Sequence, residues 1–138
     1  MTNRQMTWTD LTECVSNGVP TCRFARAPSV QMQYDKYRSR LMDQGTDVAM
    51  YVKDNVLGEM DVCIVPNAFP YDLGLNILHY VLFTKNEMTL DECHNTVAKH
   101  LTPSVEFICF RNPVRAQSIP GVIHYQIFIQ KYKRLGLT

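Results

Sequence analysis

Residues 75–85, LNILHYVLFTK, form an almost continuous apolar run with one histidine, His79, inside it. A run of this length and composition is typical of a central β-strand that is buried on both faces. The segments that flank this run therefore decide how the sheet is completed.

One helix and three further strands surround the central run. Residues 89–103, TLDECHNTVAKHLTP, predict a helix, because Thr89 and Glu92 have the spacing of a capping box and Pro103 follows its end. The apolar stripe of this helix comprises Leu90, Cys93, Val97 and Leu101. Strands are predicted in 61–66, in 104–110 (SVEFICF) and in 122–129 (VIHYQIFI). This order of elements, which is strand, strand, helix, strand, strand with short links, predicts an α+β domain with an antiparallel sheet.

The first 58 residues predict helices instead. Helical periodicity covers TWTDLTECVSNG near the start, residues 28–45 with Ser29 as N-cap, and residues 46–58 with Thr46 as N-cap. The inward positions of the second and third helices are Val30, Tyr34, Tyr37, Leu41, Val48, Tyr51, Val52 and Val56. A 58-residue unit alone would bury a marginal core. We therefore expect one domain over 1–138, with a helical part (1–58) anchored to a sheet part (59–138) by Trp8, Tyr34 and Tyr37.

Composition narrows the function classes. The chain has 138 residues and a net charge of +1, which gives no global attraction to nucleic acid or membranes. No apolar run reaches the length of a membrane helix, and no signal peptide is recognisable. The five cysteines are odd in number and form no CxxC pair, so we expect a reducing, cytoplasmic location and no disulfides. No histidine–carboxylate spacing is typical of a metal site, and no cofactor motif is present.

Two histidines lie inside predicted strands, and each strand follows a polar loop. VPNAFPYD precedes His79 and contains Asn67, a candidate ligand-binding residue, while RNPVRAQSIPG precedes His124. Either histidine alone is equally well explained as a core residue whose ring nitrogens bond to backbone groups. His94 and His100 lie off one face of the predicted helix and are expected to be solvated.

Over nearly the whole length, the chain resembles the N-acetylglucosamine-induced protein family, a fungal-centred group without an established activity. The matching features are Trp8 and three segments, YDKYRSRLMDQGTDVAMYVKDNVLG, VPNAFPYDLGLNILHYVLFTK and FRNPVRAQSIPGVIHYQIFI. The second half is also similar, more distantly, to the histidine-triad (HIT) superfamily of nucleotide hydrolases, galactose-1-phosphate uridylyltransferase and dinucleoside polyphosphate phosphorylases.

This second resemblance implies a HIT-like sheet and a set of site residues. His124 resembles the nucleophile that forms a nucleotidyl-histidine, and His79 resembles the histidine that helps to shape the nucleotide site. Gln126 resembles the glutamine of the transferase and phosphorylase branch. The phosphate-contacting loop would comprise Asn112, Gln117 and Ser118, and Arg115 could supply a positive charge there. Val122 stands where the first triad histidine would be, which would alter or abolish catalysis.

Three functions follow as alternatives. The first is a nucleotide or nucleotide-sugar hydrolase or transferase that acts through His124. The second is a catalytically silent domain that binds a nucleotide or sugar phosphate, and the third is a structural or interaction protein that reuses the fold. The first two predict a pocket lined by His79, Asn112 and His124, whereas the third predicts that Phe69, Tyr71 or Tyr125 fills this space. A homodimer is compatible with all three.

Overall fold

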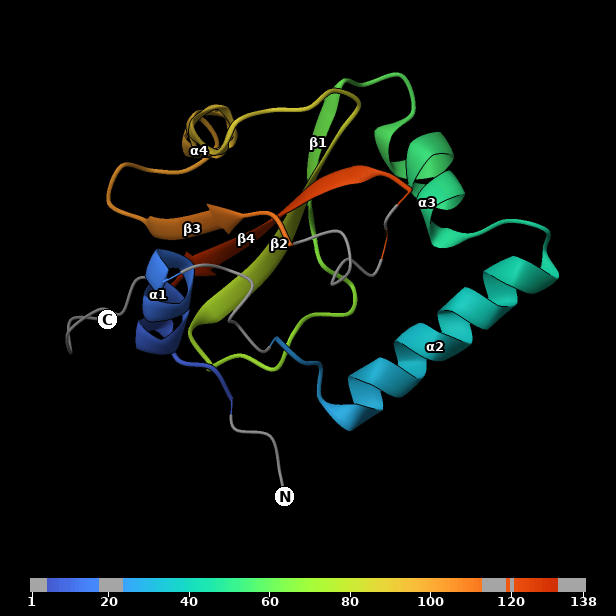
Figure 1. Ribbon diagram of the computed structural model, residues 1–138, viewed down its shortest axis with the longest axis horizontal. Coiled ribbons are helices and arrows are strands. Elements are labelled where there is room, and N and C mark those ends of the chain that lie inside the picture. Colours follow the sequence, from blue (N-terminus) through green and yellow to red (C-terminus); the bar gives the residue numbers. More distant parts are fainter. Residues whose placement is uncertain (1–4, 18–23, 113–118, 120, 132–138) are drawn as a thin grey trace.

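A four-stranded antiparallel sheet organises the fold in the computed structural model, which describes residues 5–17, 24–112, 119 and 121–131 (Figure 1). The strands are β1 (Val62–Pro66), β2 (Ile77–Thr84), β3 (Glu106–Phe110) and β4 (Ile123–Gln130), in the spatial order β1-β2-β4-β3. The predicted α+β class and antiparallel pairing are confirmed. The apolar run of residues 75–85 supplies β2, which is an inner strand as expected.

The register places both strand histidines on one face of the sheet. His79 lies opposite Phe128, and Phe83 lies opposite His124. Directly opposed residues share a face and alternate residues return to it, so His79, Gln126 and His124 follow one another along the same face. The Cα atoms of the two histidines are about 14 Å apart by strand geometry. We call this surface the histidine face.

Helix α4 (Leu90–Ala98) covers the opposite face. Thr89 and Glu92 form the reciprocal capping box, with the Thr89 hydroxyl accepting from the Glu92 N–H at 3.0 Å. Cys93 and Val97 are buried against Leu82, Tyr125 and Ile127 of the sheet. Leu90, predicted to lie on the apolar stripe, is exposed instead, because it begins the helix at the edge of this contact.

Helix α1 (Trp8–Asn17) packs on the histidine face at the β3 side. Thr7 caps it, because its hydroxyl accepts from the Asp10 N–H at 3.1 Å while the Asp10 carboxylate accepts from the Thr7 N–H at 2.9 Å. Leu11 is fully buried against Phe110 and Phe128, and Trp8 is only half-buried at the margin of the same cluster. The main anchor of this helix is therefore Leu11.

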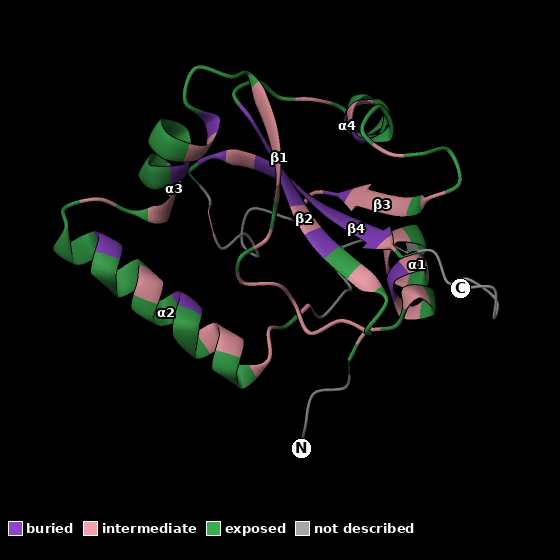
Figure 2. Cartoon of the chain, turned by 180° about the vertical axis from the view of Figure 1, so that it is seen from behind, coloured by how far each residue is buried: buried purple, intermediate pink, exposed green. Residues whose placement is uncertain are grey.

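Helix α2 (Pro28–Asp43) runs along the outside of the molecule (Figure 2). Its buried residues are Tyr34 and Leu41. Its predicted N-cap was wrong by two residues. The cap is Ala27, without a side-chain hydrogen bond, because Pro28 takes the first helical position, where a missing N–H costs nothing. Gly45 follows the helix with a φ of +79°, which a residue with a side chain rarely adopts.

The third predicted helix is a short α-helix that continues as a π-helix. Asp47, and not Thr46, is the N-cap of α3 (Val48–Tyr51), and its carboxylate accepts from the Met50 N–H at 2.9 Å. The π-helix η2 (Val52–Leu57) has wider turns than an α-helix, so the 3.6-residue periodicity misplaces its inward face. Leu57 is consequently buried together with Val52, which was predicted to face inward. Tyr51 of α3 was also predicted to face inward but is 38 % exposed.

The cysteines correct one expectation. Cys63, Cys93 and Cys109 are free, but Cys14 is disulfide-bonded, so the prediction of no disulfides was wrong. Among the described residues, no helix is both long enough and apolar enough to span a bilayer.

Candidate functional site

A cavity of about 340 Å³ lies on the histidine face, between the sheet and the helices α2, α3 and η2. We call it the histidine cavity. Its polar side chains are Arg26, Asn67, His124 and Gln126. Its aromatic side chains are Tyr34, Tyr37, Tyr51, Phe69 and Phe83. The cavity thus combines ring-stacking surfaces with hydrogen-bonding groups, the usual composition of a small-molecule site.

His124 enters the cavity from β4 in a defined protonation state. Its Nδ1–H donates to the Val122 carbonyl oxygen at 2.9 Å, and the residue is only 3 % exposed. Burial is the main cause that lowers the pKa of His124, and the positive charge of Arg111 lowers it further, against the bond to Val122. The ring is therefore neutral at pH 7. The lone pair of Nε2 makes no hydrogen bond within the described part of the chain.

His79 lies beneath the cavity floor and does not line it. The ring of Tyr71 covers it, with ring centroids 4.6 Å apart, and Phe128 packs at 4.9 Å. The Tyr71 N–H donates to His79 Nδ1 at 3.2 Å, and His79 Nε2 lies 2.5 Å from Gln126 Oε1. Burial lowers the pKa of His79 to about 4, only partly offset by the bond to Gln126. This histidine is a hydrogen-bonded neutral ring within the sheet core.

Asn67 and Gln126 reach the cavity from two different elements. Asn67 follows β1, and its Oδ1 accepts from the Phe69 N–H at 2.8 Å. Gln126 lies in β4 between the two histidines and is 5 % exposed. Both residues line the cavity, as candidate ligand-binding residues should.

Asn112 is close to this network but outside the cavity. It is buried, and its Nδ2 donates to the Tyr71 hydroxyl at 2.9 Å. Tyr71 therefore stands over both Asn112 and His79. Phe69 forms part of the cavity wall, and Tyr125 lies on the α4 face, where its hydroxyl donates to the Met88 carbonyl. Of the three residues expected to line a pocket together, only His124 does so.

The remaining loop candidates lie outside the described residues. These are Arg115, Gln117 and Ser118. Gly121 follows in the described part, and a Cβ added to it would lie 2.8 Å from the Ala49 Cβ, so only glycine fits against α3 here. Val122, at the position of a first triad histidine, is buried in the apolar cluster with Val52 and Leu57.

The helical part contributes seven of the seventeen residues that line the cavity, which the sequence did not indicate. Tyr34 and Tyr37 of α2 pack on Phe69 with centroids 5.1 and 5.3 Å apart. Arg26 precedes α2, donates from Nε to the Phe69 carbonyl at 2.7 Å and stacks on Tyr34 at 4.4 Å. The helical periodicity marked the tyrosines as inward-facing, but it could not show that they face a cavity.

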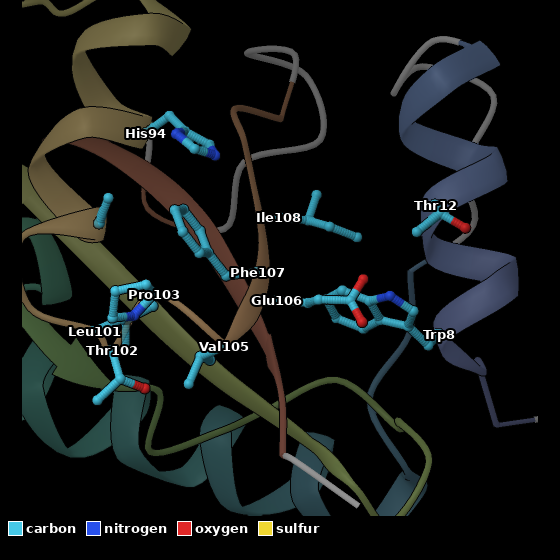
Figure 3. Close-up of a pocket in the computed structure, with 11 residues that line it drawn as sticks. Trp8, Thr12, His94, Leu101, Thr102, Pro103, Val105, Glu106, Phe107 and Ile108 are labelled. Carbon is cyan, nitrogen blue, oxygen red and sulfur yellow. The ribbon is translucent and has the colours of Figure 1, made fainter.

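A second hollow, of about 420 Å³, lies beside β3 between α1 and α4 (Figure 3). His94 of α4 stacks on Phe107 with centroids 4.4 Å apart, and Trp8 and Thr12 form the α1 side. Its polar side chains are exposed or half-exposed, so none is held in a dry environment. The described residues contain no cluster of three or more metal-ligating side chains in either hollow or elsewhere. We therefore assign the candidate site to the histidine cavity.

Comparisons with known proteins establish the family and the fold. Residues 7–130 match the family described as "Protein of unknown function (DUF3605)", so the chain belongs to that family. No curated protein matches significantly. A solved structure titled "Crystal Structure of HTC1" superposes with a TM-score of 0.70 at 16 % identity, covering 94 % of this chain and 86 % of that one. At this identity the likeness concerns the fold alone.

Proposed function

We propose that this member of the DUF3605 family binds a nucleotide or nucleotide sugar in the histidine cavity and transfers its nucleotidyl group through His124. The observation that carries the proposal is the His124 ring on the cavity wall, which is neutral, donates from Nδ1 to the Val122 carbonyl and makes no hydrogen bond at Nε2 with any described residue. A neutral imidazole with a free lone pair is a competent nucleophile near pH 7.

The aromatic and basic side chains of the cavity suit such a ligand. A base or sugar ring can stack on Tyr37, Tyr51 or Phe69, which stand at the α2 and α3 side. Arg26 brings a positive charge to the wall, and its guanidinium is fixed by the Phe69 carbonyl and the Tyr34 ring. A fixed cation in a partly dry cavity can balance phosphate charge.

The proposed reaction has two steps. The Nε2 electron pair of His124 forms a bond to the α-phosphorus while the P–O bond to the leaving group breaks, and the leaving oxygen keeps that electron pair. The ring becomes cationic, and the Val122 carbonyl stabilises its Nδ1–H. Water or an acceptor hydroxyl then attacks phosphorus and loses a proton to solvent. The P–N bond breaks, and its electron pair returns to Nε2.

Val122 restricts the leaving groups that this mechanism tolerates. Its apolar side chain cannot donate a proton where a triad histidine would stand. The leaving group must then depart as a stable anion, which suits pyrophosphate, a nucleotide or a sugar phosphate. The HIT-like relationship stays part of the proposal, supported by His124 and Gln126 sharing one face of an antiparallel sheet.

The second candidate is a silent domain that binds the same ligands, and Val122 is the observation that favours it. Two variants separate the candidates: His124→Asn, which cannot form a phosphoramidate, and His100→Asn, a control at an exposed residue just after α4. A ligand at 100 times its Kd should stabilise each protein by about 2.7 kcal/mol. Turnover should fall at least about 100-fold in His124→Asn alone.

Mass spectrometry of acid-sensitive adducts completes this test. Wild type quenched with substrate should carry a nucleotidyl group on His124. Ligand binding without an adduct or turnover would favour the silent domain. No binding of any nucleotide or nucleotide sugar would contradict both candidates and leave a structural role.

Location and assembly remain proposals as well. We keep the cytoplasm as the predicted compartment, although the disulfide at Cys14 counts against a reducing environment. A homodimer remains a prediction that light scattering after size-exclusion chromatography would check.

A further inference from the structure

We propose that His79 is a positioning residue, which locks the Gln126 side chain with its NH₂ group pointing into the histidine cavity. The floor of the cavity then presents hydrogen-bond donors and selects ligands that offer oxoanion oxygens there. This inference rests on the proposed function for the identity of the ligand, but the lock itself can be tested in the ligand-free protein.

The tautomer of His79 follows from its backbone contact. The Tyr71 N–H donates to Nδ1 at 3.2 Å, so Nδ1 must carry a lone pair. The ring is neutral, because burial lowers the pKa of His79 to about 4. Its only hydrogen on nitrogen is therefore on Nε2, and Nε2 is a donor.

The orientation of Gln126 follows in turn. Because Nε2 of His79 donates, the atom 2.5 Å away must be the Gln126 oxygen, which agrees with the observed Oε1. The reversed amide would bring two donors together inside a site where His79 is 6 % and Gln126 5 % exposed. The Gln126 NH₂ group makes no other hydrogen bond within the described residues, and it is not sealed in the interior. It is available to the cavity that the residue lines.

Asn67 is locked in the same sense by an independent contact. Its Oδ1 accepts from the Phe69 N–H at 2.8 Å, which leaves its NH₂ group on the other side. That group lies 3.4 Å from His79 Nε2, but both atoms are donors in this tautomer, so the pair is a contact and not a hydrogen bond. Asn67 and Gln126 therefore both line the cavity with their amide oxygens already engaged, on the wall that also carries His124.

A cavity floor of this kind selects ligands by the chemical group that they place against the amide donors. A phosphoryl oxygen can accept from the Gln126 NH₂ group with little reorganisation, because the bond to His79 already fixes that amide. A ligand that presents an ammonium or amide N–H at the same place would leave donors facing donors in a dry site. His79 would thus act without touching the ligand.

The first arm of the test is NMR of the ligand-free protein. Long-range ¹H–¹⁵N spectra should show His79 as the neutral Nε2–H tautomer from pH 7 down to about pH 5. A neutral Nδ1–H tautomer, or a cationic ring at pH 6, would overturn the lock whatever the protein binds.

The second arm uses inorganic pyrophosphate as the probe, with two variants of the same position. His79→Leu removes the donor, whereas His79→Gln retains an N–H at the reach of Nε2. Pyrophosphate should shift the Gln126 NH₂ resonances of wild type. Its Kd should rise about tenfold or more in His79→Leu and recover in His79→Gln, as expected for a hydrogen bond to a charged group.

A melting curve and a ¹H–¹⁵N spectrum establish that each variant is folded. If His79→Leu fails to fold, Gln126→Glu replaces it, since a carboxylate accepts from His79 but turns an oxygen toward the ligand and should abolish pyrophosphate binding. Equal affinity in wild type and in the folded variants would overturn the inference and leave the proposed function intact. Absence of binding in wild type, with the Nε2–H tautomer present, would overturn the proposed function and the ligand selectivity together.

Discussion

Burial keeps the rings of His79 and His124 neutral in the folded protein, so their protonation is coupled to unfolding. His79 and His124 are each lowered in pKa mainly by loss of solvent. The folded protein thus holds two neutral rings where an unfolded chain would bind protons in mild acid. The free energy of unfolding should therefore depend on pH through the protonation of these two histidines.

We expect stability to fall as the pH drops from 6.5 to about 4. In this window the unfolded chain, with His79 at its ordinary pKa of 6.5, binds a proton that the folded protein, with a pKa of about 4, does not. The loss from His79 should approach about 3 kcal/mol at pH 4, and His124 adds in the same direction. Well above pH 6.5 both histidines are neutral in the folded and the unfolded chain, and their contribution no longer depends on pH.

Urea unfolding at pH 7, 5.5 and 4 measures this effect. The matched control is His79→Gln, in which most of the slope should disappear, because an amide does not titrate. An equal slope in wild type and variant would show that other groups cause the acid sensitivity.

Leu11 should matter more to stability than Trp8. Leu11 is 0 % exposed in the cluster with Phe110 and Phe128, so Leu11→Ala should cost about 2–5 kcal/mol. Trp8 is half-exposed, so Trp8→Ala should cost less than the about 3–5 kcal/mol of a fully buried indole. Thermal unfolding of the two variants compares them directly. A larger loss for Trp8→Ala would contradict the assignment of Leu11 as the anchor.

At the scale of elements, the capping box of α4 offers a local test. The Thr89 hydroxyl accepts from the Glu92 N–H, and the Glu92 carboxylate accepts from the Thr89 N–H at 2.8 Å. Thr89→Ala should cost about 1 kcal/mol, whereas Thr89→Ser keeps the hydroxyl and should cost much less. Chemical denaturation measures both, and equal losses would show that the hydroxyl does not cap the helix.

The sequence predicted those elements whose signals are local. The apolar run of β2, the Thr89–Glu92 box and the alternation in β4 each depend on neighbours in the chain, and each element forms as predicted. The N-caps of α2 and α3 were predicted at the wrong residues, although Ser29 and Thr46 have suitable side chains. Pro28 begins α2 one residue before Ser29, and the Asp47 carboxylate caps α3 one residue after Thr46. A sequence pattern with a 3.6-residue period does not reveal the π-helix η2.

The candidate site was predicted in part, for the same reason. The sequence predicted the two strands that carry His79, His124 and Gln126, and the register places these residues on one face. It could not show that Tyr71 covers His79, or that α2 brings Tyr34 and Tyr37 to the cavity, because both depend on contacts between distant segments. No local sequence pattern indicated that Arg26 lines the cavity.

At the scale of the whole molecule, the two halves of the chain share their cores. Leu11 of α1 packs with Phe110 and Phe128, and Val52 and Leu57 of η2 pack with Val81 and Phe83 of β2. Each of these clusters loses one side if residues 1–58 are removed. The histidine cavity would also lose its α2 and α3 walls.

We therefore predict that residues 1–58 and 59–138 unfold together as one domain. The only tryptophan, Trp8, lies in α1, so its fluorescence reports on the helical part, while far-UV circular dichroism follows the whole chain. The two signals should give the same urea midpoint and slope, as two-state unfolding requires. Limited trypsin digestion should yield no persistent fragment, with digestion in urea as the control that cleavable bonds exist throughout the chain. An earlier transition of Trp8, or a stable fragment that begins near residue 60, would show that the sheet folds without the helices and that the cavity is a joint between two units.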